Sequence, residues 1–89
     1  MNQIDAQLEQ FGFKKHLDNL DMIEYHNYYH DKKFMLELTY YKATFSWRAM
    51  VLELVNPGSD RPFYSEVHRQ SGASLLSLYK DAVEWMIEQ

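Results

Sequence analysis

The sequence contains no cysteine. Its absence excludes disulfide bonds, thiolate nucleophiles and every metal site built on cysteine. Because small secreted domains usually depend on disulfides, we expect a reducing, cytoplasmic setting. The residues Met1–Asp5 also lack the basic region and apolar run of a signal peptide, so we do not expect one.

Long apolar runs and catalytic signatures are lacking as well. The longest wholly apolar run is Ala49–Leu52, far shorter than the roughly 20 residues that span a membrane. Nucleophile motifs, glycine-rich phosphate loops and paired-carboxylate signatures are missing too. We therefore predict no membrane contact, no catalytic residue, no cofactor and no metal site, in a protein that is not an enzyme.

An excess of positive charge is also absent. The formal net charge is −4, and acidic and basic residues balance between Gly12 and Gln70, so the acidic excess lies at the two ends. Such a distribution offers no long-range attraction to a phosphate backbone. It makes nucleic acid the less favoured partner and suits a protein partner that is itself basic.

Aromatic and other apolar residues are plentiful, at 16% and 46% of the chain. They suffice for a packed core in a single domain over residues 1–89. Apolar residues alternate through Lys33–Tyr41 and again through Thr44–Val55. That period of two is typical of half-buried strands, and the short link Lys42–Ala43 predicts an antiparallel hairpin.

Further elements surround this hairpin. The pattern predicts strands at Phe13–Leu17 and Met22–Tyr29, and another that begins near Phe63. A short helix is predicted over Asn2–Phe11, with Asn2 as N-cap and Gly12 at the C′ position. A second helix, capped by Ser71, is predicted to run to about Glu88 along a stripe that includes Leu75, Leu76 and Tyr79. The prediction is a two-layer α+β fold: a four- to five-stranded antiparallel meander with both helices on one face.

One strand changes its pattern partway. Odd positions carry the apolar residues as far as Ala49, whereas Met50, Leu52 and Leu54 carry them afterwards. Such a change indicates either a β-bulge or sharp bend in this strand, or a central strand covered on both faces. The sequence leaves both interpretations open.

Histidines and acidic residues suggest two possible sites. His26, Asn27, His30 and Asp31 resemble metal-ligand spacing, but residues four apart on a strand are about 13 Å apart, so solvent-facing histidines are the favoured interpretation. Glu24 with His26, and Glu66 with His68, have same-face spacing within their strands. They would form an acid–base site, and support an enzyme, only if the two strands were neighbours.

The sheet face opposite the helices is the candidate binding surface. Tyrosine, tryptophan, methionine and arginine are enriched where proteins meet. We predict partner-binding roles for Tyr28, Tyr41, Arg48 and Tyr64. Two alternatives remain: single-stranded nucleic acid stacked on the aromatic residues beside lysines, and a homodimer formed through an edge at Arg61–Tyr64.

The chain resembles small, uncharacterised proteins encoded by phages and prophages of Gram-positive bacteria in three segments: Phe11–Leu17, Asp21–Asn27 and Lys33–Leu38. The shared features are a short helix ending in Gly-aromatic-Lys-Lys and a meander of acidic and aromatic strands. The resemblance covers the first half of the chain, and the long strand Trp47–Val55 is atypical of it. It implies a compact accessory protein that binds and modulates another protein, with no catalytic residue to transfer.

Overall fold

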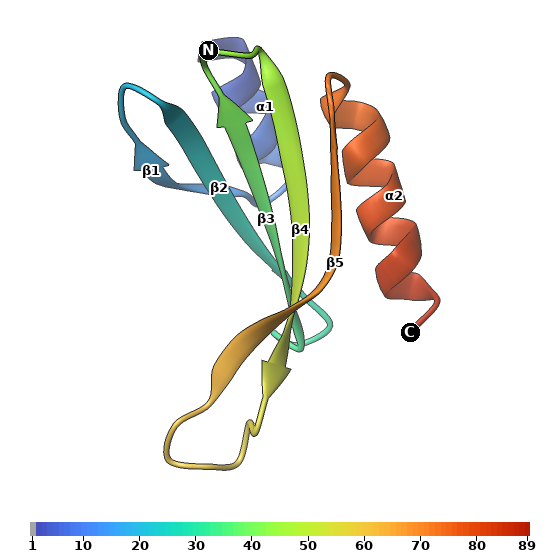
Figure 1. The fold of residues 1–89 in the computed structure, drawn as a ribbon. Helices are drawn as coiled ribbons and strands as arrows, with labels where there is room; N and C mark the ends of the chain where they lie inside the picture. The colour runs from blue at the N-terminus through green and yellow to red at the C-terminus, as the bar shows by residue number, and fades with distance from the viewer. Residues whose placement is uncertain (1) are drawn as a thin grey trace.

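The computed structural model describes residues 2–89, and describes side chains from residue 3 onward (Figure 1). It contains two helices and five strands: α1 Asn2–Gln10, β1 Lys14–Asp18, β2 Met22–Tyr29, β3 Phe34–Tyr41, β4 Ser46–Val55, β5 Phe63–Gly72 and α2 Leu75–Ile87. The strands lie in the order β1-β2-β3-β4-β5, and each neighbouring pair is antiparallel. The predicted α+β meander is confirmed.

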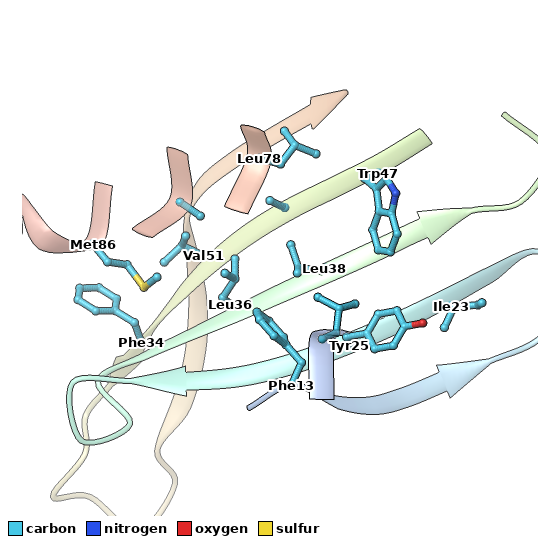
Figure 2. Close-up of a cluster of buried hydrophobic side chains, with 13 residues drawn as sticks. Phe13, Ile23, Tyr25, Phe34, Leu36, Leu38, Trp47, Val51, Leu78 and Met86 are labelled. Atoms are coloured by element: carbon cyan, nitrogen blue, oxygen red, sulfur yellow. The ribbon is translucent and has the colours of Figure 1, made fainter. Parts of the chain in front are cut away.

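The hydrophobic core lies between the helices and one face of the sheet (Figure 2). Alternate side chains of β2, β3 and β4 point into this core, as the period of two predicts. Both helices contribute to the same cluster, so they cover the same face of the sheet. Its members are Leu8, Phe13, Ile23, Tyr25, Phe34, Leu36, Leu38, Trp47, Ala49, Val51, Leu78, Ala82 and Met86.

Helix α2 packs through one stripe of residues spaced four apart. Leu78, Ala82 and Met86 are the buried residues of the helix, and the two larger side chains each contribute about 2 kcal/mol by burial. Leu76, predicted to belong to the apolar stripe, is instead exposed. The N-cap is Ser74, whose hydroxyl accepts a hydrogen bond from the Ser77 backbone N–H at 3.3 Å.

The predicted N-cap, Ser71, is wrong because β5 continues farther than its apolar pattern. The strand runs to Gly72, and Ser71 pairs with Arg48 of β4. Backbone pairing with the long strand β4 maintains this extension, although Gln70, Ser71 and Gly72 offer no apolar alternation to reveal it. Among residues 2–89, neither helix is long and apolar enough to span a membrane.

Gly12, the glycine that the sequence indicates, lies just past the end of helix α1 and caps it. Gly12 has φ +94°, a left-handed conformation that side chains rarely adopt, and the Phe13 N–H donates to the Leu8 carbonyl at 2.9 Å. The predicted N-cap, Asn2, is the first residue of α1, and its side chain lies outside the described part of the chain. The backbone reversal at Gly12 directs the chain into β1.

Asp5 connects α1 to the sheet. Its carboxylate accepts hydrogen bonds from the Tyr25 hydroxyl and from Lys15 Nζ, the latter at 3.1 Å. These two contacts, with the hydrogen bond from Tyr25 the larger cause, lower the pKa of Asp5. The short helix is therefore held by polar contacts on β1 and β2 as well as by Leu8 in the core.

The turn between β3 and β4 is longer than predicted. It spans Lys42–Phe45 rather than Lys42–Ala43, and Phe45 has a positive φ of 52° and an exposed side chain. Phe45 therefore does not belong to the strand. The Lys42 ammonium donates to the Asn19 carbonyl at 2.6 Å, which ties this turn to the turn between β1 and β2.

The β-bulge in this part of the sheet lies in the neighbouring strand β5, so it does not cause the parity change within β4. Strand β4 pairs without interruption along β3, whereas the register between β4 and β5 shifts between Val51 and Leu52, where Val67 of β5 is the extra residue. The prediction of a bulge within Thr44–Val55 is therefore wrong. Leu52 and Leu54 lie on the sheet face opposite Val51 and are half-buried there, so β4 is covered to some degree on both faces.

We predict that Asp5→Asn weakens the fold at neutral pH. The pKa of Asp5 in the folded protein lies below the ordinary value of 3.8. The ionised carboxylate therefore stabilises the fold above pH 3.8, and this stabilisation is lost as the pH falls through the pKa of the folded state. Urea unfolding between pH 3 and 7, followed by tryptophan fluorescence, measures the difference in the free energy of unfolding between wild type and variant. This difference should become smaller as the pH is lowered. The control Glu9→Gln removes the same charge from an exposed position of α1, and an equal effect from it would contradict the anchoring role of Asp5.

Candidate functional site

The candidate site is the sheet face that carries neither helix, here called the open face. The strand register assigns its residues, because directly paired residues project to the same side. Figure 1 shows β1 and β5 as the two edges of this surface. The open face includes His16, Met22, Glu24, His26, Tyr28, Met35, Glu37, Thr39, Tyr41, Arg48, Met50, Leu52, Leu54, Tyr64, Glu66 and Arg69.

All four predicted binding residues lie on the open face, in two pairs. The rings of Tyr28 and Tyr64 have centroids 6.0 Å apart, within the range of favourable aromatic pairs. The Arg48 guanidinium lies 5.7 Å from the centre of the Tyr41 ring, as a cation–π pair. The two pairs occupy opposite ends of the central strands, because Tyr28 pairs with Met35 at the start of β3 and Tyr41 ends that strand.

The Tyr28–Tyr64 pair lies within an apolar surface, here called the aromatic patch: Tyr28, Met35, Leu52, Leu54 and Tyr64. Met35 is buried although no helix covers this face, and the other four remain partly or largely accessible. The Tyr64 hydroxyl donates to the Lys32 carbonyl at 2.7 Å, which orients its ring. The patch therefore presents fixed aromatic side chains with apolar residues between them.

A group of charged and polar residues, here called the polar cluster, lies beside this patch: Glu24, His26, Glu37, Thr39 and Arg48. Glu37 and Thr39 are only 8% and 0% exposed. The Arg48 Nη2 donates to Glu37 Oε1 at 3.0 Å, and His26 Nε2 lies 3.0 Å from Glu24 Oε2 and 3.6 Å from Glu37 Oε2. Glu37 therefore has several polar neighbours, as a buried carboxylate requires.

Burial raises the pKa of the Glu37 carboxyl, and the neighbouring Glu24 carboxyl raises it further. His26 and Arg48 act in the opposite direction but do not cancel these effects. The Arg48 Nε is itself buried without a hydrogen-bond partner in the described part of the chain. The cluster thus contains one buried donor, Arg48 Nε, that its own contacts do not satisfy.

The two acid–imidazole pairs do not converge. Strands β3 and β4 separate β2 from β5, so the pairs lie about three strand spacings, or about 14 Å, apart. The bulge at Val67 also places Glu66 and His68 on opposite faces of the sheet. His68 lies 2.7 Å from Asp81 of α2, on the helix side. The geometry that an enzyme would require of these pairs is not present.

The histidines next to the β2–β3 turn are also separated. His26 belongs to the open face, whereas His30 lies in the turn with φ 53° and packs edge-on against Phe34 of the core face, with centroids 5.7 Å apart. Instead, His16 of β1 stacks on His26, with centroids 4.3 Å apart and an interplanar angle of 15°. Sequence reasoning missed this pair, because the register shift between Lys15 and Leu17 turns His16 toward the open face.

Sequence reasoning also missed Glu37. Within Lys33–Tyr41, Glu37 shares odd-numbered positions with Met35 and Thr39. This alternation alone could have indicated that its side chain lies on the open face. Its contact with His26 required the register of β2 on β3, in which the two residues are directly paired. No known protein family, curated protein or solved structure matches the chain in comparisons of sequence and fold. The likeness to phage-encoded proteins stays a prediction.

We predict that Arg48→Ala destabilises the protein by about 1–3 kcal/mol, because it leaves the buried Glu37 carboxylate without its guanidinium partner. Urea unfolding at pH 7 measures the loss. Adding Glu37→Gln to Arg48→Ala should restore part of it, since the uncompensated charge is then removed. The matched control is Arg69→Ala, whose partner Glu66 is exposed, and which should cost less than about 1 kcal/mol. Equal losses from both arginine variants would contradict this role of Glu37.

Proposed function

We propose that this protein is a non-catalytic, cytoplasmic binding module that binds and modulates another protein through its open face. The observation that carries the proposal is the aromatic patch, an apolar surface on a sheet face that neither helix covers. Apolar surface of this kind, when accessible beside ordered polar groups, is typical of protein–protein contact sites. A phage- or prophage-type accessory role is the setting that the sequence resemblance implies.

The arrangement of the open face supports this assignment. Tyr28 and Tyr64 present large rings whose conformational freedom is already reduced by mutual packing and by the hydrogen bond to Lys32. Fixed aromatic side chains lose little entropy on binding, so they are effective anchors. The Tyr41–Arg48 pair at the other end adds a cationic group that can recognise a carboxylate or an aromatic ring of the partner.

Net charge and sheet edges bear on the kind of partner. The acidic excess at the two ends of the chain favours encounter with a basic protein. Strand β5 pairs only with β4 among residues 2–89, so its outer edge can also pair with a strand of a partner or of a second copy. Sedimentation of the purified protein therefore accompanies the binding experiments, because it shows whether the protein forms a homodimer.

Single-stranded nucleic acid is a second candidate partner, favoured by a hollow of about 520 Å³ at the β1–β2 side of the open face. Lys14, Lys15 and Lys32 line it together with Tyr28. Lysines that hold phosphates around an exposed ring are the elements with which proteins bind single strands. Affinity of this kind falls steeply with salt and disappears after nuclease treatment, unlike affinity that depends on the aromatic patch.

We predict that Tyr64→Ala abolishes capture of the partner while the protein stays folded. The tagged protein is the bait in bacterial lysate, with and without nuclease treatment. Mass spectrometry and staining for nucleic acid identify what is captured, and circular dichroism checks that each variant is folded. The matched control is Phe63→Ala, because Phe63 is the preceding aromatic residue of β5, is 53% exposed and projects to the opposite face.

The same protein should be recovered with wild type and with Phe63→Ala, and lost with Tyr64→Ala. Loss with both variants would place the contact at the β4–β5 hairpin rather than on the open face. Equal recovery with all three proteins would contradict the proposed role of the aromatic patch. Recovery of nucleic acid alone, lost after nuclease treatment, would favour the second candidate.

A further inference from the structure

Three side chains at the β1–β2 side of the open face bring metal-binding atoms together. His16, Glu24 and His26 each offer one ligand atom, and these atoms all lie within 4.8 Å of one another. His26 Nε2 and Glu24 Oε2 are 3.0 Å apart, close to the separation of about 3.3 Å that Zn–N and Zn–O bonds of tetrahedral geometry give between neighbouring ligands. To bind one ion together, the imidazoles of His16 and His26 would rotate out of their stacked arrangement.

We propose that His16, Glu24 and His26 form a binding site for a divalent transition-metal ion of the zinc type. Two imidazoles and one carboxylate are a ligand set that zinc uses in sites with three protein ligands. Magnesium and calcium prefer sites made of oxygen ligands alone. This inference goes beyond the proposed protein binding and does not depend on it.

The strand geometry explains how the three ligands come together. Glu24 and His26 are two residues apart on β2, so they project to the same face. The register shift in β1 leaves His16 opposite no single residue of β2, between the pairs Lys15–Tyr25 and Leu17–Glu24. This bulge turns the imidazole of His16 onto the same face, where it stacks on His26.

The electrostatic surroundings suit a cation at this position. Glu24 and Glu37 are both close to His26 Nε2, and Arg48 neutralises only Glu37 directly. A divalent ion between the imidazoles and Glu24 would relieve the repulsion between the two carboxylates. Glu37, held by Arg48 and Thr39, lies 3.6 Å from the same Nε2 atom, so its carboxylate would add negative charge beside the ion.

The site is also accessible. His16 is exposed, and both histidines line the hollow of about 520 Å³ beside β1. An ion can therefore enter without a rearrangement of the core. With three protein ligands, a fourth position remains for water or for a group of a bound partner. The sequence analysis predicts no metal site, because it considered His26 together with His30, and the proximity of His16 to His26 depends on the strand register.

The test uses the full chain without an affinity tag, stripped of metal with a chelator and titrated with zinc chloride in a calorimeter. We expect one ion per chain, and an absorption spectrum typical of low coordination number when cobalt(II) replaces zinc. His16→Ala, His26→Ala and Glu24→Gln should each weaken binding by about 100-fold or more, beyond the roughly 10–100-fold effect of outer-sphere groups. Because His16 is exposed, its variant should keep the stability of the metal-free wild type.

The other two histidines provide matched controls. His30→Ala and His68→Ala remove imidazoles from the turn and from the α2 side of the sheet, and both variants should bind zinc as the wild type does. The proposal is overturned if the wild type binds no zinc at concentrations of about 100 µM, if His16→Ala binds as tightly as wild type, or if a control variant loses the ion. None of these outcomes affects partner capture through Tyr64, so the two proposals fail separately.

Discussion

The open face depends on one buried carboxylate. Glu37 lies on the central strand β3, is 8% exposed, and has no helix above it. A buried charge is costly unless polar groups surround it, so its position requires Arg48, Thr39 and His26 to be held where they are. These contacts order the middle of a face that otherwise faces solvent, and they set the positions of the groups on either side. The aromatic patch and the three proposed metal ligands both adjoin this ordered centre.

The two faces of the sheet have different roles. The helix side holds almost all of the buried apolar residues, and the hydrophobic effect there accounts for the stability of the fold. The open side combines an accessible apolar patch with a charged cluster, which is less favourable for an isolated protein than a second helical layer would be. The proposal of a binding face gives this arrangement a physical reason: the surface that the helices leave accessible is available to a partner.

Much of the fold could be predicted from the sequence, because the relevant signals are local. The alternation around Leu36, the glycine after α1 and the stripe of α2 each specify an element without reference to the rest of the chain. The faces of Tyr28, Tyr41, Arg48 and Tyr64 follow from the same alternation. The contacts within the site could not be predicted, since they depend on strand register and on two bulges, at His16 and Val67. A one-residue shift reverses the face of every later side chain in a strand, and for this reason His16 was missed and Glu66 was grouped with His68.

The central claim is that the open face, rather than the helix layer, contacts the partner. The methionine methyl groups test it most directly, because Met35 and Met50 lie on the open face whereas Met86 of α2 is buried on the helix side of the sheet. The measurement is a titration of methyl-¹³C-methionine protein with the captured partner, followed by NMR. We predict that the Met35 and Met50 signals shift or broaden while the Met86 signal stays in place. A complex that perturbs Met86 and leaves the other two unchanged would contradict it.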